Sequence, residues 1–109
     1  MQPETVRTMI EHLKNADSKI RLAAIDSLEP WGPNSAAAVP ALTTALRDRS
    51  CMVRRKAAEA LGRIGPAAQT AVDALNHALK DRIHTVRDAA WSALAHIRES
   101  SPGVPPAEA

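Results

Sequence analysis

The sequence is short of aromatic residues and cysteine, and both shortages narrow the possible folds. Its 109 residues include no Phe, no Tyr, two Trp and a single Cys. One cysteine excludes an internal disulfide and is compatible with a reducing compartment. Aromatic and β-branched residues favour sheets, whereas alanine favours helices. A chain poor in aromatics and rich in Ala and Leu is therefore expected to consist of closely packed helices.

Long apolar runs are also missing. No run approaches the roughly 20 residues that a membrane-spanning helix requires. Charged residues interrupt the N-terminal stretch MQPETVRTMIEHLK, where a signal peptide would need its apolar segment. We therefore expect a soluble, cytoplasmic protein without membrane contact, formed as one domain with a modest core.

Positive charge is concentrated in three windows, residues 14–21, 47–56 and 80–88. The formal net charge of the chain is +2, but these windows hold eleven basic and four acidic residues, so the remainder is acidic. One edge of the folded chain is therefore predicted to be basic. Such an edge could follow the phosphates of a nucleic acid, although a run of charge is more often a solvated surface.

A unit of 33 residues occurs three times. Residues 48–66 align with residues 81–99 one unit later and with residues 15–33 one unit earlier. Each unit contains two stretches in which apolar residues recur at helical spacing, so each is predicted to be a pair of helices. The predicted helices are residues 4–14, 19–30, 36–47, 52–63, 68–80 and 85–98, in repeats of about 1–33, 34–66 and 67–99.

The second helix of each unit has a clear apolar stripe, in which alanines are expected where two helix backbones approach closely. The predicted core positions of these helices are Ile20, Ala24, Leu28 and Trp31, then Val53, Ala57, Leu61 and Ile64, then Val86, Ala90, Leu94 and Ile97. Gly-Pro pairs at 32–33 and 65–66 mark the unit boundaries. If Ser35 caps its helix, Pro40 falls in the second turn and is expected to bend it. The tail, residues 100–109, has three prolines and no periodicity, and is predicted to be disordered.

The repeat resembles the HEAT-like repeat of the phycobilisome-lyase type, whose unit reads roughly D-x-x-x-x-V-R-x-x-A-x-x-A-L-G-x-I-G, with A-V-P-A-L in the preceding helix. The chain shows this pattern as Asp48, Val53-Arg54, Ala57, Ala60-Leu61-Gly62 and Ile64-Gly65, after Ala38-Val39-Pro40-Ala41-Leu42. The resemblance covers residues 4–98. It implies an all-α fold, a right-handed α-solenoid of three helical hairpins.

The resemblance also implies an Asp–Arg ladder that ties successive turns together. The residues at the matching positions are Asn15 and Arg21, Asp48 and Arg54, and Asp81 and Arg87. A planar Arg fork suits a carboxylate and neighbouring carbonyls alike. The alternative is that these are solvated surface charges, each pair contributing about 0–1 kcal/mol.

In repeats that this chain resembles, the second helices line the concave face, where partners bind. Spacing from the apolar stripe places nine candidate partner-binding residues there: Leu22, Ile25, Asp26, Glu29, Arg55, Glu59, Asp88, Trp91 and Ser92. Exposed Trp is enriched at interface hot spots. Trp91 therefore has two interpretations, a binding anchor or a cap over the C-terminal end of the stack.

Catalytic and metal-binding patterns are weak. The fold resembles that of deoxyhypusine hydroxylase and of bilin lyases, but the di-iron site of the hydroxylase uses repeated His-Glu pairs, and this chain has no His-Glu dipeptide. Cys51 and His84 occupy equivalent repeat positions, yet a structural zinc site usually needs four ligands. We therefore expect no catalysis, metal or cofactor.

The sequence thus predicts a scaffold that binds a protein partner, or itself, through the concave face. The first alternative is a nucleic-acid-binding module that uses the basic edge, and the second is a subunit of a lyase-like or hydroxylase-like enzyme. Salt-dependent binding that is weakened by Arg55→Ala and Lys56→Ala would indicate nucleic acid. Concentration-dependent mass that is lost on Trp91→Ala would indicate self-association.

Overall fold

The computed structural model describes residues 4–99, and all of the regular structure in this part of the chain is helical. The helices are α1 (Glu4–His12), α2 (Ser18–Leu28), α3 (Val39–Ala45), α4 (Cys51–Ile64), α5 (Val72–Ala78) and α6 (His84–Glu99). The 3-10 segments η1 (Glu29–Ala38) and η2 (Gly65–Ala71) join successive hairpins. The predicted disordered tail, residues 100–109, lies outside the described residues.

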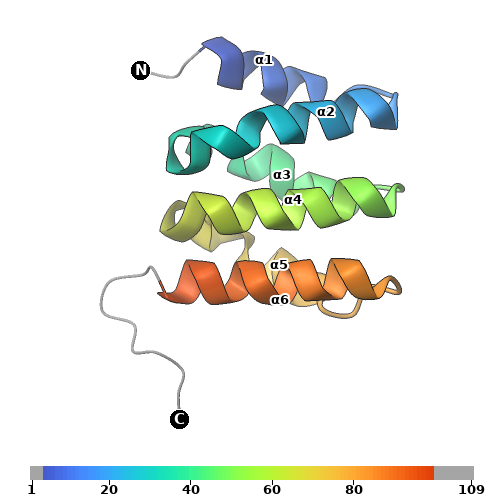
Figure 1. Cartoon of the computed structure of the whole chain (residues 1–109), viewed down its shortest axis with the longest axis vertical. Coiled ribbons are helices and arrows are strands. Elements are labelled where there is room, and N and C mark those ends of the chain that lie inside the picture. The colour runs from blue at the N-terminus through green and yellow to red at the C-terminus, as the bar shows by residue number, and fades with distance from the viewer. Residues whose placement is uncertain (1–3, 100–109) are drawn as a thin grey trace.

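The helices form two layers in a slab of 43 × 37 × 18 Å. Figure 1 shows α2, α4 and α6 side by side in one layer, with α3 and α5 behind them. Every hairpin reverses at the same edge and passes to the next hairpin at the opposite edge, in the same right-handed sense. The predicted right-handed solenoid of three hairpins is confirmed. Below, the edge that carries the turns within hairpins (residues 13–17, 46–50 and 79–83) is called the turn edge.

The first helices of the second and third hairpins are shorter than predicted. They begin at Val39 and Val72, three and four residues later than expected, because a 3-10 segment precedes each one. Gly32 and Gly65 have φ values of 48° and 78°, which residues with a Cβ rarely adopt, and these glycines redirect the chain between hairpins.

The late start of α3 overturns two expectations. Pro40 lies in the first turn, where its missing N–H breaks no intrahelical hydrogen bond, so the predicted bend is wrong. Ser35 does not cap the helix. It is buried, and its hydroxyl donates to the carbonyl oxygen of Gly32 at 2.8 Å, which satisfies a polar group inside the junction.

Most of the predicted core stripe is buried, including the alanines at 24, 57 and 90. Ile20 and Trp31 are exceptions, being exposed and half-buried respectively. Val53 and Val86, at the repeat position of Ile20, are fully buried. The preceding hairpin covers this position, and no hairpin before α1 lies within residues 4–99. Trp31 lies in η1, beyond the end of α2, and packs against the margin of the core.

The α4–α6 contact depends on the absence of a side chain at Gly62. A Cβ placed on this residue would lie 3.0 Å from Cα and 3.2 Å from Cβ of Ala93. Such distances are shorter than ordinary van der Waals contact. Gly62 therefore sets how closely the second helices of the last two hairpins approach.

Candidate functional site

Arginines of the second helices link each hairpin to the next. Arg21 donates from Nε and Nη2 to the two carboxylate oxygens of Asp48, at 2.6 and 2.8 Å, and from Nη1 to the carbonyl oxygen of Asn15 at 2.7 Å. Arg54 repeats this arrangement with Asp81, at 2.8 and 3.1 Å, and with the carbonyl oxygen of Asp48 at 2.8 Å. Each guanidinium thus holds its own turn with one nitrogen and the next hairpin's carboxylate with two.

The ladder aspartates also close their own turns. Asp48 accepts the backbone N–H of Ser50 at 2.9 Å, and Asp81 accepts that of Ile83 at 3.0 Å. Burial by itself would raise the pKa of both carboxyls, but the arginine and backbone hydrogen bonds, together with nearby positive charge, outweigh burial and lower it. Both groups are therefore carboxylates at neutral pH and bind their arginines as anions.

We expect the ladder to make the free energy of unfolding depend on pH. Because the folded pKa values lie below the unfolded ones, the contribution is complete above pH 5 and is lost as the pH falls from about 4 through the folded pKa. Urea unfolding of the wild type and of Asp48→Asn, from pH 7 to pH 2, measures this effect. The difference in unfolding free energy between the two proteins should shrink as the pH falls. A difference that is constant over the whole range would contradict the assignment.

The two ends of the ladder differ. Asn15 stands at the position of Asp48 and Asp81, and its Oδ1 accepts the backbone N–H of Asp17 at 2.8 Å. Arg87 donates from Nη1 to the carbonyl oxygen of Asp81 at 2.6 Å. No residue among 4–99 supplies a carboxylate to Nε and Nη2 of Arg87. The first turn therefore lacks an acid at the ladder position, and the last arginine lacks a carboxylate partner within the described chain.

The predicted concave row is partly wrong. Ile25 was expected to face outward, but it is fully buried, as is Ala58 at the same repeat position, whereas Trp91 is 68% exposed. This position points at the following hairpin, which covers Ile25 and Ala58 but has no counterpart after α6 in residues 4–99. Leu22 is half-buried and packs against the core. The remaining members are half-buried (Glu29, Arg55, Glu59) or exposed (Asp26, Asp88, Ser92).

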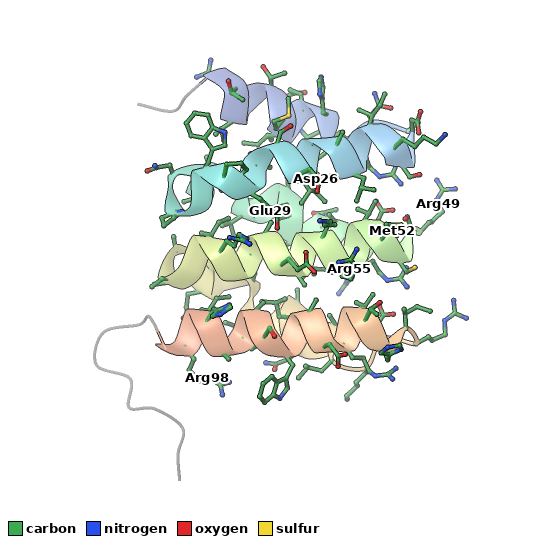
Figure 2. The ribbon with its side chains drawn as sticks, in the orientation of Figure 1. Asp26, Glu29, Arg49, Met52, Arg55 and Arg98 are labelled. Atoms are coloured by element: carbon green, nitrogen blue, oxygen red, sulfur yellow. The ribbon has the colours of Figure 1, made fainter. Side chains whose placement is uncertain are left out.

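Ion pairs join α2 and the first residue of η1 to α4, within the layer formed by α2, α4 and α6. Lys56 Nζ lies 3.3 Å from Asp26 Oδ1, and Arg63 Nε lies 3.5 Å from Glu29 Oε2. Figure 2 shows Asp26 of α2 and Glu29, the first residue of η1, on the side that faces α4. These pairs are partly exposed, so each contributes at most about 1 kcal/mol. Their main effect is a surface of alternating charge over the joint between two hairpins.

An open groove of about 710 Å³ runs over the start of η1, just beyond α2, and over parts of α4 and α6. Small residues, Gly62, Ala89 and Ala93, line it where α4 meets α6, and the junction residues Gly32 and Gly65 line its end. Its charged and hydrogen-bonding side chains are Glu29, Glu59, Arg63, Ser92 and His96. The groove thus combines an apolar floor with polar walls drawn from all three hairpins.

Three of the nine predicted partner-binding residues, Glu29, Glu59 and Ser92, line this groove. The other six, Leu22, Ile25, Asp26, Arg55, Asp88 and Trp91, lie outside it. Arg63 and His96 were missed. These two residues occupy equivalent positions in the second and third repeats. They directly follow Gly62 and Ala95, so applying the 33-residue spacing to the next position would have identified them.

The basic edge is smaller than the sequence suggested. Arg21 and Arg54 are held in the ladder, Lys56 pairs with Asp26, and Arg55 donates to Glu59 at 2.9 Å. Figure 2 shows Arg49 extending away from the body at the turn edge. The basic residues that remain exposed along this edge are Lys14, Lys19, Arg47, Arg49, Lys80, Arg82 and Arg87.

Within residues 4–99, no group of three or more His, Cys, Asp and Glu side chains is arranged to hold a metal ion. Cys51 is half-buried and His84 is exposed. None of the described helices has both the length and the apolar character needed to cross a membrane.

The comparison with known proteins agrees with the stacked hairpins. The family of HEAT repeats matches residues 39–107, which is more than half of the chain. No curated protein gives a significant match. On the strength of the family match, this chain belongs to the HEAT repeat family.

Proposed function

We propose that this protein is a non-catalytic interaction scaffold that binds a partner polypeptide in the groove lined by Glu29, Arg63 and Ser92. HEAT repeats generally mediate protein interactions. The observation that supports the proposal most directly is the groove itself, which all three hairpins build together. Its acids, Glu29 and Glu59, are paired with basic side chains.

The chemistry of the groove suits an extended polypeptide. Arg63 is about two-thirds exposed and uses Nε toward Glu29, so its other guanidinium nitrogens can donate to a partner's carbonyl or carboxylate oxygens. Ser92 and His96 add hydrogen-bonding groups on the opposite wall. The small residues of the floor allow a partner backbone to approach closely. A groove of this kind can bind the main chain of a partner along its floor and the partner's polar groups at its walls.

Two finer assignments belong to the same proposal. The short alanine-rich unit supports membership of the phycobilisome-lyase type of HEAT-like repeats. The single cysteine, half-buried in α4, supports a reducing setting such as the cytoplasm.

We expect a photo-crosslinking residue at Ser92 to capture a partner in extract of the native source, with much less capture from Thr44 on the exposed side of α3. Unlabelled wild-type protein should compete for the Ser92 adduct. Competition by Arg63→Glu should be about tenfold weaker, because a carboxylate replaces the exposed donor. Arg98→Glu is the matched control. Its side chain is exposed on α6 outside the groove, and it should compete like the wild type. Equal capture from Ser92 and Thr44 would refute the groove as the binding site.

A second candidate function is supported by the turn edge. Seven exposed basic residues line this edge, while Asp48 and Asp81 are engaged by arginines, so the edge suits a polyanion such as a nucleic acid. In this case duplex DNA should bind with an affinity that falls steeply with salt and with Arg49→Glu and Arg82→Glu. Arg55 and Lys56 are poor probes, because both side chains are paired with acids in the second-helix layer. DNA binding unaffected by these edge variants would exclude this candidate.

A further inference from the structure

We propose that the outer face of the third hairpin is a docking site for an aspartate-bearing helical turn of another protein chain, with Arg87 as the carboxylate receptor. This end face consists of Val72, Leu79, Ile83, Arg87 and Trp91. None of these residues lines the groove, so the site is separate from the proposed scaffold surface. The internal repeats provide the evidence, because the same positions in the first two hairpins show what this face is built to bind.

Arg87 has the same arrangement as the two arginines that do bind a carboxylate. In Arg21, Arg54 and Arg87 alike, Nη1 donates to the carbonyl oxygen of the residue six positions earlier, at 2.7, 2.8 and 2.6 Å. In the first two, Nε and Nη2 then take both oxygens of an aspartate in the next turn. Arg87 is therefore held by the same hydrogen bond within its own turn, and no acid among residues 4–99 occupies its Nε and Nη2 donors.

Apolar surface surrounds this arginine. Trp91 is 68% exposed, whereas its equivalents Ile25 and Ala58 are fully buried beneath the following hairpin. Ile83, at the base of α6, is also exposed. The first helix shows the same trend, since Val72 and Leu79 are half-buried while their counterparts in the second hairpin are buried. An apolar face with an oriented cation at its edge favours a partner that combines an acid with an apolar helix.

The two ladder aspartates show what local structure the partner's acid should have. Asp48 and Asp81 each accept the N–H two residues later in their own turn while binding the arginine of the preceding hairpin. The matching partner therefore presents an aspartate in a turn that opens a helix. A second wild-type copy stacked head to tail lacks an aspartate at this position, three residues before the helix, because the neutral Asn15 stands there. Its Asp17 lies two residues later, where it caps α2 and accepts the N–H of Lys19 at 2.9 Å.

Because the wild type has Asn15 at the ladder position, a variant of the chain itself can serve as the test ligand for the end face. The variant Asn15→Asp gives the first hairpin the aspartate turn that the end face is proposed to bind. We expect sedimentation equilibrium to show association at least tenfold tighter than that of the wild type, with a mass that grows beyond a dimer because head-to-tail contacts do not close. Adding Arg87→Gln, or Trp91→Ala, to this variant should restore wild-type behaviour. Circular dichroism confirms that each variant is folded.

Three results would overturn the proposal. Asn15→Asp could sediment like the wild type, which would show that Arg87 does not bind such an aspartate. Wild-type protein could associate in a manner lost on Trp91→Ala, which would make a second unmodified copy the occupant. Deletion of residues 100–109 could by itself allow association through Trp91, which would make this chain's own C-terminal segment the occupant.

Discussion

Replacing Gly62 by leucine is expected to lower the free energy of unfolding by about 2–3 kcal/mol, close to the upper end for overpacking a core. A Cβ at this position would already lie 3.0 Å from Cα of Ala93, a backbone atom that cannot rotate out of the way. The whole of α6 would have to move away from α4. The gain in helix propensity from removing a glycine, about 1 kcal/mol, is included in this net value.

The third hairpin supplies the matched control. Ala95 occupies the repeat position of Gly62, but it is only half-buried and no hairpin follows it among residues 4–99. Ala95→Leu should therefore change stability by less than about 0.5 kcal/mol. Urea unfolding of the two variants and the wild type measures the contrast. If Gly62→Leu and Ala95→Leu unfold alike, the close approach of α4 and α6 does not limit packing.

Replacing Arg54 by alanine is expected to cost about 2 kcal/mol. The change removes both hydrogen bonds to the carboxylate of Asp81 and those to the carbonyl oxygens of Asp48 and Arg49. The side chains of Arg54 and Asp81 are 15% and 12% exposed, so the carboxylate that remains is largely shielded from water. A charged hydrogen bond contributes more than a neutral one, and a shielded charge left without its partner adds a desolvation penalty. Some remaining access to water keeps the cost below that of a fully buried pair.

Arg87→Ala tests the same side chain at the same repeat position without a carboxylate. Its exposed guanidinium donates to the carbonyl of Asp81, so the expected loss is below about 1 kcal/mol. Thermal and urea unfolding of both variants give the comparison. A loss for Arg87→Ala as large as that for Arg54→Ala would mean that the carboxylate link adds little. A small loss would leave Arg87 available for a partner, as the end-face proposal requires.

The two ends of the molecule differ in their ladder residues. Asn15 replaces an acid where no preceding arginine is described, whereas Arg87 keeps the ladder arginine where no following acid is described. Apolar residues are exposed at both ends, since Ile20 is exposed where Val53 and Val86 are buried, and Trp91 is exposed where Ile25 and Ala58 are buried. The ladder is what distinguishes the two ends, because the third hairpin keeps its arginine and the first has no acid at the ladder position.

The 33-residue period and its apolar positions were enough to predict the all-helical fold, the three hairpins and most of the core. Alanine at positions 24, 57 and 90, leucine at 28, 61 and 94, and the Gly-Pro junctions carry this information locally, because helical periodicity and chain reversal depend on nearby residues. The starts of α3 and α5 were misjudged, since a 3-10 segment is made of the same alanine-rich sequence as the helix that follows it.

Only the tertiary structure shows whether a side chain on the outer side of a helix faces water or the next hairpin. Spacing along one helix separates the core side from the other sides, but it does not distinguish water from the next hairpin in the stack. For this reason Ile25 was placed outside when α4 buries it. The pairing of Arg21 with Asp48, 27 residues away, likewise depends on the rise and rotation from one hairpin to the next, which are set by packing.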